Sequence, residues 1–354
     1  MSILQLYEAD PRGVTAERVG PLPDASEALV RREINGEYSL SVVLPKGAQF
    51  ANEATVGRAI KATVNETGKQ QFFIIKRRPR TLTGGVQIYA EHQSYLYNGI
   101  CIGTNGPNVD GYCRTVWRGL RSYAVPSITD IATFTYSRDR ELRKNFPGRE
   151  TPVHLMDLLK GWLIEAAGGE IDWDGFDAEW LDQMGEDNGA CYRYGANLTE
   201  MEEEDVLDGY ASGIYPYWGR RGDENRPLVE IEGKILLYPG NLPLQAIEPV
   251  DLSEQFDEAP TPAQLLAAAQ AYAAEHAPTG LPASIRADRA RIAGDVPVDL
   301  GDTVRVVHER WGVDVRTRIC ALTFDALRDR VQDVSFGAIN PGFAGAVRNV
   351  ARTG

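Results

Sequence analysis

The sequence has few of the residues that build disulfides and metal centres. It holds 4 cysteines and 4 histidines in 354 positions. Neither a C-x-x-C pair nor an H-E-x-x-H or H-x-H spacing occurs, so a zinc site would need ligands from distant segments. We expect the scattered cysteines to stay reduced and to act as small core residues. These residues are Cys101, Cys113, Cys191, Cys320, His92, His154, His276 and His308.

Long apolar runs are also missing. No segment approaches the roughly 18 to 20 apolar residues that cross a bilayer as a helix. Residues 1–7 lack the basic stretch and the small-residue cleavage site of a secretory signal. We therefore expect a protein that folds in a cytosol and does not insert into a membrane.

Basic residues are fewer than acidic ones, 37 against 50, so the formal net charge is −13. A protein that binds duplex DNA needs a basic surface to neutralise phosphates, so the charge argues against a DNA reader. The basic cluster that stands out covers residues 76–80, Lys-Arg-Arg-Pro-Arg. We expect a solvated strand end or a salt-bridging contact to a neighbouring subunit there, with a phosphate contact as the alternative.

Sequence motifs of catalysis are absent as well. There is no G-x-S-x-G elbow, no P-loop and no dinucleotide fingerprint. We predict no enzyme, no catalytic residues and no cofactor, although a Cys–His or Ser–His–Asp site assembled in space stays open. His92 and His308 both fall in strand patterns and are expected to be packed or surface residues.

Three acidic or adhesive motifs have simpler explanations. The acidic run 200–205 could hold a cation, but Thr199 and Glu202 also fit a capping box on a solvated helix start. Residues 172–177 resemble a calcium loop with the glycine misplaced and no closing glutamate, which favours a turn. The Arg-Gly-Asp triplet at 221–223 is expected to be a chance loop sequence. No metal site is predicted.

The sequence is instead rich in patterns that are typical of β-strands and turns. Glycine (35) and proline (20) are plentiful, and 43% of the residues are hydrophobic. Residues 28–34 and 37–44 flank Asn35-Gly36, which predicts a hairpin with a type I′ turn and one buried face. A second hairpin is predicted around the turn 65–69, and another strand at 86–92. The segment 98–150 looks irregular.

Helices are predicted in the middle of the chain. One begins at Thr151-Pro152 and presents leucines toward a core until Gly168-Gly169, and another begins at Thr261-Pro262 and ends near 278. Strands return at 303–309 and 313–319. A third strand, 330–336, breaks its alternation, which indicates a bulge.

Seven short stretches together resemble the phage tail hub proteins, including the N-terminal hub region of the prophage tail-endopeptidase and tail-associated lysin group. Each is weak alone, but they occur in the family's order over nearly the whole chain. They are NGEYSLSVVLP (35–45), QQFFIIK (70–76), IYAEHQSYL (88–96), YGANL (194–198), IYPYWG (214–219), VDLGDTVRV (298–306) and DVSFG (333–337). They are structural motifs, so no active site is carried over.

The resemblance implies an α+β, β-rich, multidomain chain. It would form two small β-barrels with α/β segments between them, and as a homotrimer a pseudo-sixfold ring. The ranges expected are 1–97 for the first barrel, 98–229 for the intervening arm, 230–345 for the second barrel including helix 261–276, and 346–354 for a tail.

The implied function is a structural hub of a virion tail or tail-like particle assembled in the bacterial cytoplasm. It would join the sixfold tube or distal tail protein to a threefold spike or tip, and let DNA and the tape-measure protein pass as cargo. Longer relatives append a peptidase, for which no room is expected before Gly354. Two alternatives stay open: a peptidoglycan hydrolase, and a carbohydrate-binding adhesin that uses the aromatic stretch 215–218 as a sugar platform.

Overall fold

The structure is a computed structural model of the 354-residue chain. None of its described helices is both long and apolar enough to span a bilayer. The described residues are 3–9, 15–79, 84–103, 110–138, 143–145, 152–164, 167–205, 211–219, 222, 226–238, 246–256, 258–276, 283–289, 296–311 and 313–336.

The chain forms two compact units. The first comprises Met1–Glu202 and Ile285–Ile339, and the second comprises Glu203–Ser284 and Asn340–Gly354. The predicted range 230–345 is therefore shared between the two units. The ranges 1–97, 98–229, 230–345 and 346–354 stay a prediction about assembly modules.

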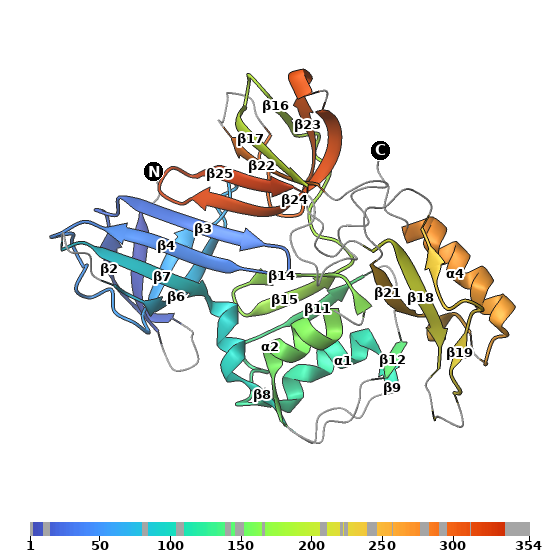
Figure 1. Ribbon diagram of the computed structural model, residues 1–354. Helices are drawn as coiled ribbons and strands as arrows, with labels where there is room; N and C mark the ends of the chain where they lie inside the picture. Colours follow the sequence, from blue (N-terminus) through green and yellow to red (C-terminus); the bar gives the residue numbers. More distant parts are fainter. Residues whose placement is uncertain are drawn as a thin grey trace. The chain divides into compact units, whose positions relative to one another are not determined.

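An N-terminal β module opens the first unit (Figure 1). Its strands pair in the order β3-β4-β7-β6-β5-β1-β2. Alternate residues of β4, among them Leu40 and Val42, are fully buried, which confirms the predicted one-sided core. The strands are β1 (Leu4–Ala9), β2 (Thr15–Leu22), β3 (Glu27–Glu33), β4 (Tyr38–Leu44), β5 (Ala59–Thr63), β6 (Gln70–Arg77) and β7 (Val86–His92).

The predicted hairpin of β3 and β4 is present, but its predicted turn type is wrong. A type I′ turn needs positive φ at both central residues. Asn35 has φ +52°, whereas Gly36 is not among the positive-φ residues. The reason is a longer loop: the Glu33 amide donates to the Glu37 carbonyl, and the Gly36 amide donates to the Glu33 carbonyl.

A second β module is built largely from the C-terminal part of the chain. Its strands pair in the order β17-β22-β25-β24-β23-β16. The register of β24 on β25 slips twice, once at Cys320 and once at Gln332, so the bulge predicted in the last strand is confirmed. The strands are β16 (Cys191–Arg193), β17 (Leu198–Asp205), β22 (Ala283–Arg289), β23 (Thr303–His308), β24 (Val313–Asp325) and β25 (Arg330–Phe336).

The two β modules share one sheet. Residues 313–318 of β24 pair with β23, and residues 321–325 pair with β3 in antiparallel register. Figure 1 shows these late strands beside β3, which comes from the start of the chain. The result is a 13-stranded sheet, and within the described residues no sheet closes into a barrel. The β-rich fold is thus established, while the two barrels stay a proposal.

Residues 93–190 contain more regular structure than the sequence indicated. Short helices and strands surround a core of Tyr97, Trp117, Phe134 and Trp180, all at most 3% exposed. The elements are η1 (Gln93–Gly99), β8 (Cys101–Ile102), β9 (Asp110–Tyr112), α1 (Cys113–Gly119), η2 (Leu120–Tyr123), β10 (Ala124–Val125), β11 (Phe134–Ser137), β12 (Arg143–Asn145), β13 (Val153–His154), α2 (Leu155–Asp157), η3 (Leu158–Ile164), β14 (Glu170–Asp174) and β15 (Asp177–Leu181).

The helix predicted to start at Thr151-Pro152 begins later. Val153 and His154 pair with β8 as strand β13, so the helix starts at Leu155 and continues as a π-helix from Leu158. Thr151 itself lies outside the described residues. The predicted apolar stripe is confirmed where side chains are described, because Leu155, Leu158, Leu159 and Leu163 are buried.

The second unit pairs a small sheet with one helix. Strand β18 pairs with β19 and β20 on one side and with β21 on the other. Helix α4 starts and ends close to where the sequence predicted, and Thr261 and Gln264 form a capping box through reciprocal side-chain bonds. The elements are β18 (Gly213–Trp218), β19 (Val229–Glu230), β20 (Leu236–Leu237), β21 (Ile247–Asp251), η4 (Ser253–Gln255) and α4 (Pro262–His276), and the first unit adds η5 (Glu309–Trp311).

Candidate functional site: a polar junction in the first unit

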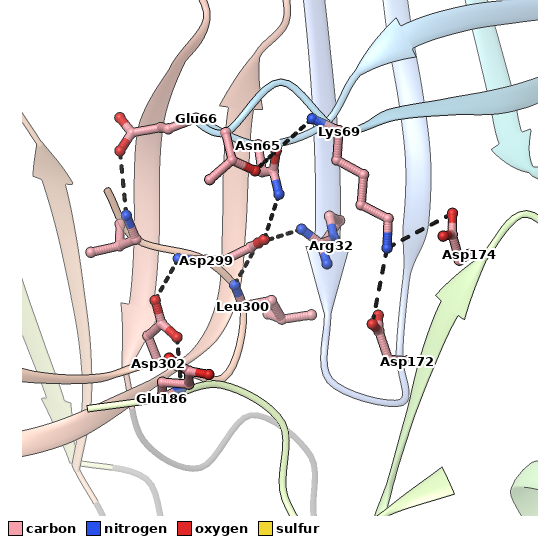
Figure 2. A network of polar contacts seen from close by, with 12 residues as sticks. Arg32, Asn65, Glu66, Lys69, Asp172, Asp174, Glu186, Asp299, Leu300 and Asp302 are labelled. Carbon is pink, nitrogen blue, oxygen red and sulfur yellow. Dashed lines mark hydrogen bonds and ion pairs between the residues drawn. The ribbon is translucent and has the colours of Figure 1, made fainter. Parts of the chain in front are cut away.

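A turn before β23 connects the two β modules through polar contacts (Figure 2). The Asp299 carboxylate accepts a bond of 2.5 Å from the Arg32 guanidinium of β3. Its other oxygen accepts a bond of 2.8 Å from the Asn65 side chain, in the turn between β5 and β6. The nearby Glu66 carboxylate accepts from the Val298 amide at 3.3 Å. One short turn thus contacts two separate hairpins of the N-terminal module.

Asp302 stabilises the same turn from the other side. Its carboxylate accepts from the amide of Asp299 at 2.8 Å and from the amide of Glu186 at 2.9 Å. Burial raises the pKa of Asp302 above its usual value, although the two amides oppose this shift. Asp302 therefore links the turn to the segment that follows β15.

Two glycines allow that segment to lie against the turn. Gly185 and Gly301 have φ of +78° and +90°. A Cβ added to Gly185 would lie 2.1 Å from the carbonyl carbon of Gly301, and one added to Gly301 would lie 2.7 Å from the backbone of Met184. The two backbones approach so closely that no side chain fits between them.

A buried ion pair lies beneath this contact. The Arg318 guanidinium of β24 donates to both carboxylate oxygens of Glu170 in β14, at 2.8 and 2.9 Å. It also donates to the carbonyls of Gly301 and Met184. Every side of the pair is therefore hydrogen-bonded, as a buried charge requires.

The loop that resembles a calcium site is a hairpin turn between β14 and β15, as predicted. Its carboxylates Asp172 and Asp174 lie 4.0 and 3.9 Å from the Lys69 ammonium (Figure 2). Burial raises the pKa of Asp172, while Lys69 and Arg32 oppose the shift. These acids thus connect the hairpin to the N-terminal module.

His92 belongs to a buried chain of polar groups. Gln71 Oε1 accepts from the Gly175 amide at 2.9 Å and lies 3.1 Å from His92 Nε2, which assigns the ring proton to Nε2. Nδ1 then accepts from Ser94. Burial, with Arg32 and Lys69 nearby, lowers the pKa of His92 well below its usual value, so the ring is neutral. His92 was expected to be a packed or a surface residue, and the structure shows that it is packed.

A small cavity lies beside the junction, between the β3–β4 turn and the π-helix. It is lined by Arg32, Tyr95 and Lys160 among others, and its volume of about 20 Å³ is room for a single water molecule. Lys160 donates to the Gly36 carbonyl at 3.2 Å, and burial lowers its pKa. The cavity is too small for a substrate.

The other residues singled out in the sequence lie apart from the junction. His308 is buried, and the centroid of its ring lies 4.2 Å from the centroid of the Tyr194 ring. His154 Nδ1 lies 3.8 Å from Cys101 Sγ, a neighbour on the paired strand that the sequence spacing did not reveal. All 4 cysteines are free thiols. Among the described residues, no group of three or more His, Cys, Asp or Glu is arranged to hold a metal.

The basic cluster 76–80 makes contacts within the chain. Lys76 lies 3.7 Å from Glu91, Arg77 stacks over the Tyr89 ring, and Arg78 donates to the Ala51 carbonyl. Arg80 lies outside the described residues. A contact of this cluster with a neighbouring subunit stays a prediction.

Two further interpretations concern acidic and adhesive motifs. The capping box at Thr199 and Glu202 is wrong, because this segment is strand β17 and not a helix start. The side chains of residues 200–205 lie outside the described residues, as do Arg221 and Asp223 of the Arg-Gly-Asp triplet.

The chain has the fold of phage tail proteins. The prophage tail protein gp18 from Listeria monocytogenes EGD-e matches over 100% of both chains, with a TM-score of 0.60 and 13% identity. A tail protein from Neisseria meningitidis MC58 matches over 98% of both chains (TM-score 0.59, 12% identity). The 43 kDa tail protein of prophage MuSo2 from Shewanella oneidensis matches over 97% of this chain and 100% of its own (TM-score 0.58, 10% identity).

No family model and no curated protein matches the chain. At identities of 10% to 13%, the likeness concerns the fold alone. The resemblance to phage tail proteins that the sequence motifs indicated is confirmed at that level, and the hub position stays a proposal.

Proposed function

We propose that this protein is a non-enzymatic structural component of a phage tail or tail-like particle, and specifically its hub. The observation that carries the proposal is the fold, which matches three tail proteins over nearly their full lengths. The hub would join the sixfold tail tube or distal tail protein to a threefold spike or tip. It would act in the virion tail after assembly in the host cytoplasm.

The junction supports a structural role. Its charged groups bind one another: Arg318 pairs with Glu170, Arg32 with Asp299, and Lys69 with Asp172 and Asp174. Reactive sites normally hold a cavity with polar groups directed at a ligand. Here the polar groups hold the two β modules together, as is expected of a structural component.

The strand order bears on the two proposed barrels and supports the second one. In the N-terminal module the path ends at β2 and β3, which are separated in sequence by residues 23–26. In the second module it ends at β16 and β17, separated by residues 194–197. Strands joined by so few residues are neighbours in most folds, so the second path needs only one more pairing to close. In the N-terminal module, residues 29–33 of β3 already pair with β24, which leaves only the start of β3 for a contact with β2.

In the proposed assembly three copies form a ring of six barrels. Three copies carry three times the formal charge of −13. An acidic lumen would repel DNA and so allow DNA and the tape-measure protein to pass without sticking. Replacing lumen-facing acids by lysine is expected to slow DNA ejection, and unchanged ejection would refute the conduit.

Two other functions remain to be tested. In the carbohydrate-binding proposal, the stretch 215–218 would stack on sugars, but Trp218 is 1% exposed and Pro216 is buried, so only the tyrosines could contribute. Binding on a glycan array would favour this function. Turnover of purified peptidoglycan by the isolated chain would favour a hydrolase.

The direct test of the hub is its mass and its place in the particle. The purified chain is expected to sediment as a trimer, and antibodies against it are expected to label the distal end of the tail. A monomer at micromolar concentration, together with labelling along the tube or none at all, would refute the hub. Labelling elsewhere on the tail would leave the broader structural role intact.

A further inference from the structure

Within the part of the second unit that the structure describes, the small sheet has a helix on one face only. Ile214 and Trp218 of β18 and Val250 of β21 form a core with Leu265 and Ala269 of α4. These residues occupy alternate positions along their strands, so they define the inner face. The residues between them must lie on the opposite, outer face.

The outer face is apolar as well. Tyr217 pairs with Glu230, and Tyr215 with Pro249, so these residues share that face. Ile235 and Leu237 flank Leu236, which packs on the core, and they are 47% and 53% exposed. Leu228, just before β19, is 37% exposed. A sheet face in contact with water normally carries polar side chains, so a face of this kind marks a docking surface.

Charges on this face are mostly acidic. Tyr217 lies between Glu230 and Asp251 in the registers of the neighbouring strands. The Tyr215 hydroxyl also donates to Glu230, and Lys234 lies 3.4 Å from the same carboxylate. The segment 203–284 holds 14 acidic residues against 4 basic ones.

The charge selects among possible occupants. Two copies of the face laid on each other would bring Glu230 and Asp251 of one copy against the acids of the other, which is unfavourable. Duplex DNA and anionic lipid are repelled for the same reason. A polypeptide whose apolar side chains are flanked by lysine or arginine meets both requirements of the face.

We infer that the outer face of the β19-β18-β21 sheet binds another protein through an apolar segment flanked by basic residues. This docking surface is defined by Tyr215, Tyr217, Leu228, Ile235, Leu237 and Pro249. The inference goes beyond the hub role and does not depend on it, because it rests on the composition of this face alone.

The test uses the full chain and three labelled ten-residue peptides, measured by fluorescence anisotropy. The first alternates valine and lysine, the second valine and glutamate, and the third serine and lysine. The valine–lysine peptide is expected to bind at least ten-fold more tightly than either of the others. Its affinity is expected to fall as sodium chloride rises from about 0.05 M to about 0.5 M.

Variants locate the binding. The double change Ile235→Ser and Leu237→Ser is expected to weaken binding of the valine–lysine peptide at least ten-fold. The matched control is Ile3→Ser with Val56→Ser, which removes two apolar side chains of similar exposure, 54% and 61%, from the first unit. Both double variants are expected to keep the wild-type circular dichroism spectrum.

Three outcomes would overturn the inference. Equal binding of the valine–glutamate peptide would remove the charge argument. Equal loss in the control variant, or no binding of any peptide, would remove the surface. A wild-type oligomer that dissociates in the Ile235→Ser, Leu237→Ser variant would identify a second copy as the occupant instead.

Discussion

Arg318 and Glu170 form a two-bonded ion pair in which the side chains are only 6% and 4% exposed. Arg318 lies in β24 and Glu170 in β14, and the two residues are 148 positions apart in the sequence. The guanidinium also binds the carbonyls of Gly301 and Met184, so the pair holds together β24, β14, the turn before β23 and the segment after β15. This contact is the centre of the junction, and its removal is the sharpest test of it.

Arg318→Met is expected to destabilise the first unit by about 3–5 kcal/mol, because the buried Glu170 charge then loses its cationic partner and keeps only the bond from the Met184 amide. The double variant Arg318→Met, Glu170→Gln is expected to lose less stability than Arg318→Met alone, since no uncompensated charge remains. Urea denaturation monitored by tryptophan fluorescence measures both. Arg305→Met is the control: its partner Asp314 is half exposed, so a much smaller loss of stability is expected. Equal losses at Arg318 and Arg305 would contradict the role of burial.

Gly185→Ala is expected to destabilise the protein much more than Gly189→Ala. Both glycines have φ of +78°, so alanine meets the same backbone cost of about 1–2 kcal/mol at each. Only at Gly185 does the new methyl group meet the Gly301 backbone, at 2.1 Å, whereas nothing lies within 4 Å at Gly189. Thermal unfolding of the two variants measures the difference. Similar melting temperatures would show that the two segments do not touch.

The stability of the wild-type chain is expected to fall in mild acid because of His92. Its pKa is lowered in the folded state, so the unfolded chain binds the proton more readily. The His92 contribution is complete above the unfolded pKa of about 6.5 and is lost below it, by up to about 1.4 kcal/mol per pH unit. His92→Gln is expected to flatten this slope between pH 7 and 5.

Denaturation curves at several pH values measure the slope. His154→Gln, at an exposed position, is the matched control and is expected to keep the wild-type profile. A slope that is unchanged in His92→Gln would mean that other groups cause the acid sensitivity.

Asp172→Asn is expected to gain stability relative to the wild type as the pH rises from about 4. The pKa of Asp172 is raised mainly by burial, so the folded state holds the proton more tightly than the unfolded chain does. Ionisation in the folded state therefore costs free energy that the asparagine avoids. Urea curves of both proteins between pH 4 and 7 measure this, and a difference that shrinks with rising pH would reverse the sign of the argument.

Strands β3 and β24 are expected to exchange their amide hydrogens as one cooperative unit. Five residue pairs, from Ala321↔Glu33 to Asp325↔Leu29, join them, and Val30 and Phe324 at this contact are fully buried. Hydrogen exchange followed by mass spectrometry measures their opening free energies. The same value is expected for both strands. Loss of protection in β24 while β3 stays protected would mean that the two β modules open independently.

Local patterns in the sequence predicted strands β3 to β7 and β23 to β25, the helix at 262–276 and the bulge in the last strand. Alternation, a proline at the first helical position and glycine-rich turns act over a few residues, so they can be recognised directly. The capping box predicted at Thr199 and Glu202 failed, because this segment pairs as strand β17. The turn type at Asn35-Gly36 and the helix start at Leu155 were missed because a longer loop and a pairing with β8 overrode the local preference.

The tertiary structure alone decided the junction and the outer face of the second unit. Glu170, Gly185 and Arg318 carry no motif, and the stretch around Gly301 did not reveal which segment it contacts. Only the pairing of β24 with both β23 and β3 brings the two β modules into one sheet. Ion pairs and backbone contacts between distant segments depend on how the chain folds back, and no spacing along the sequence encodes that distance. Which side of the 213–218 strand is covered likewise depends on where α4 packs.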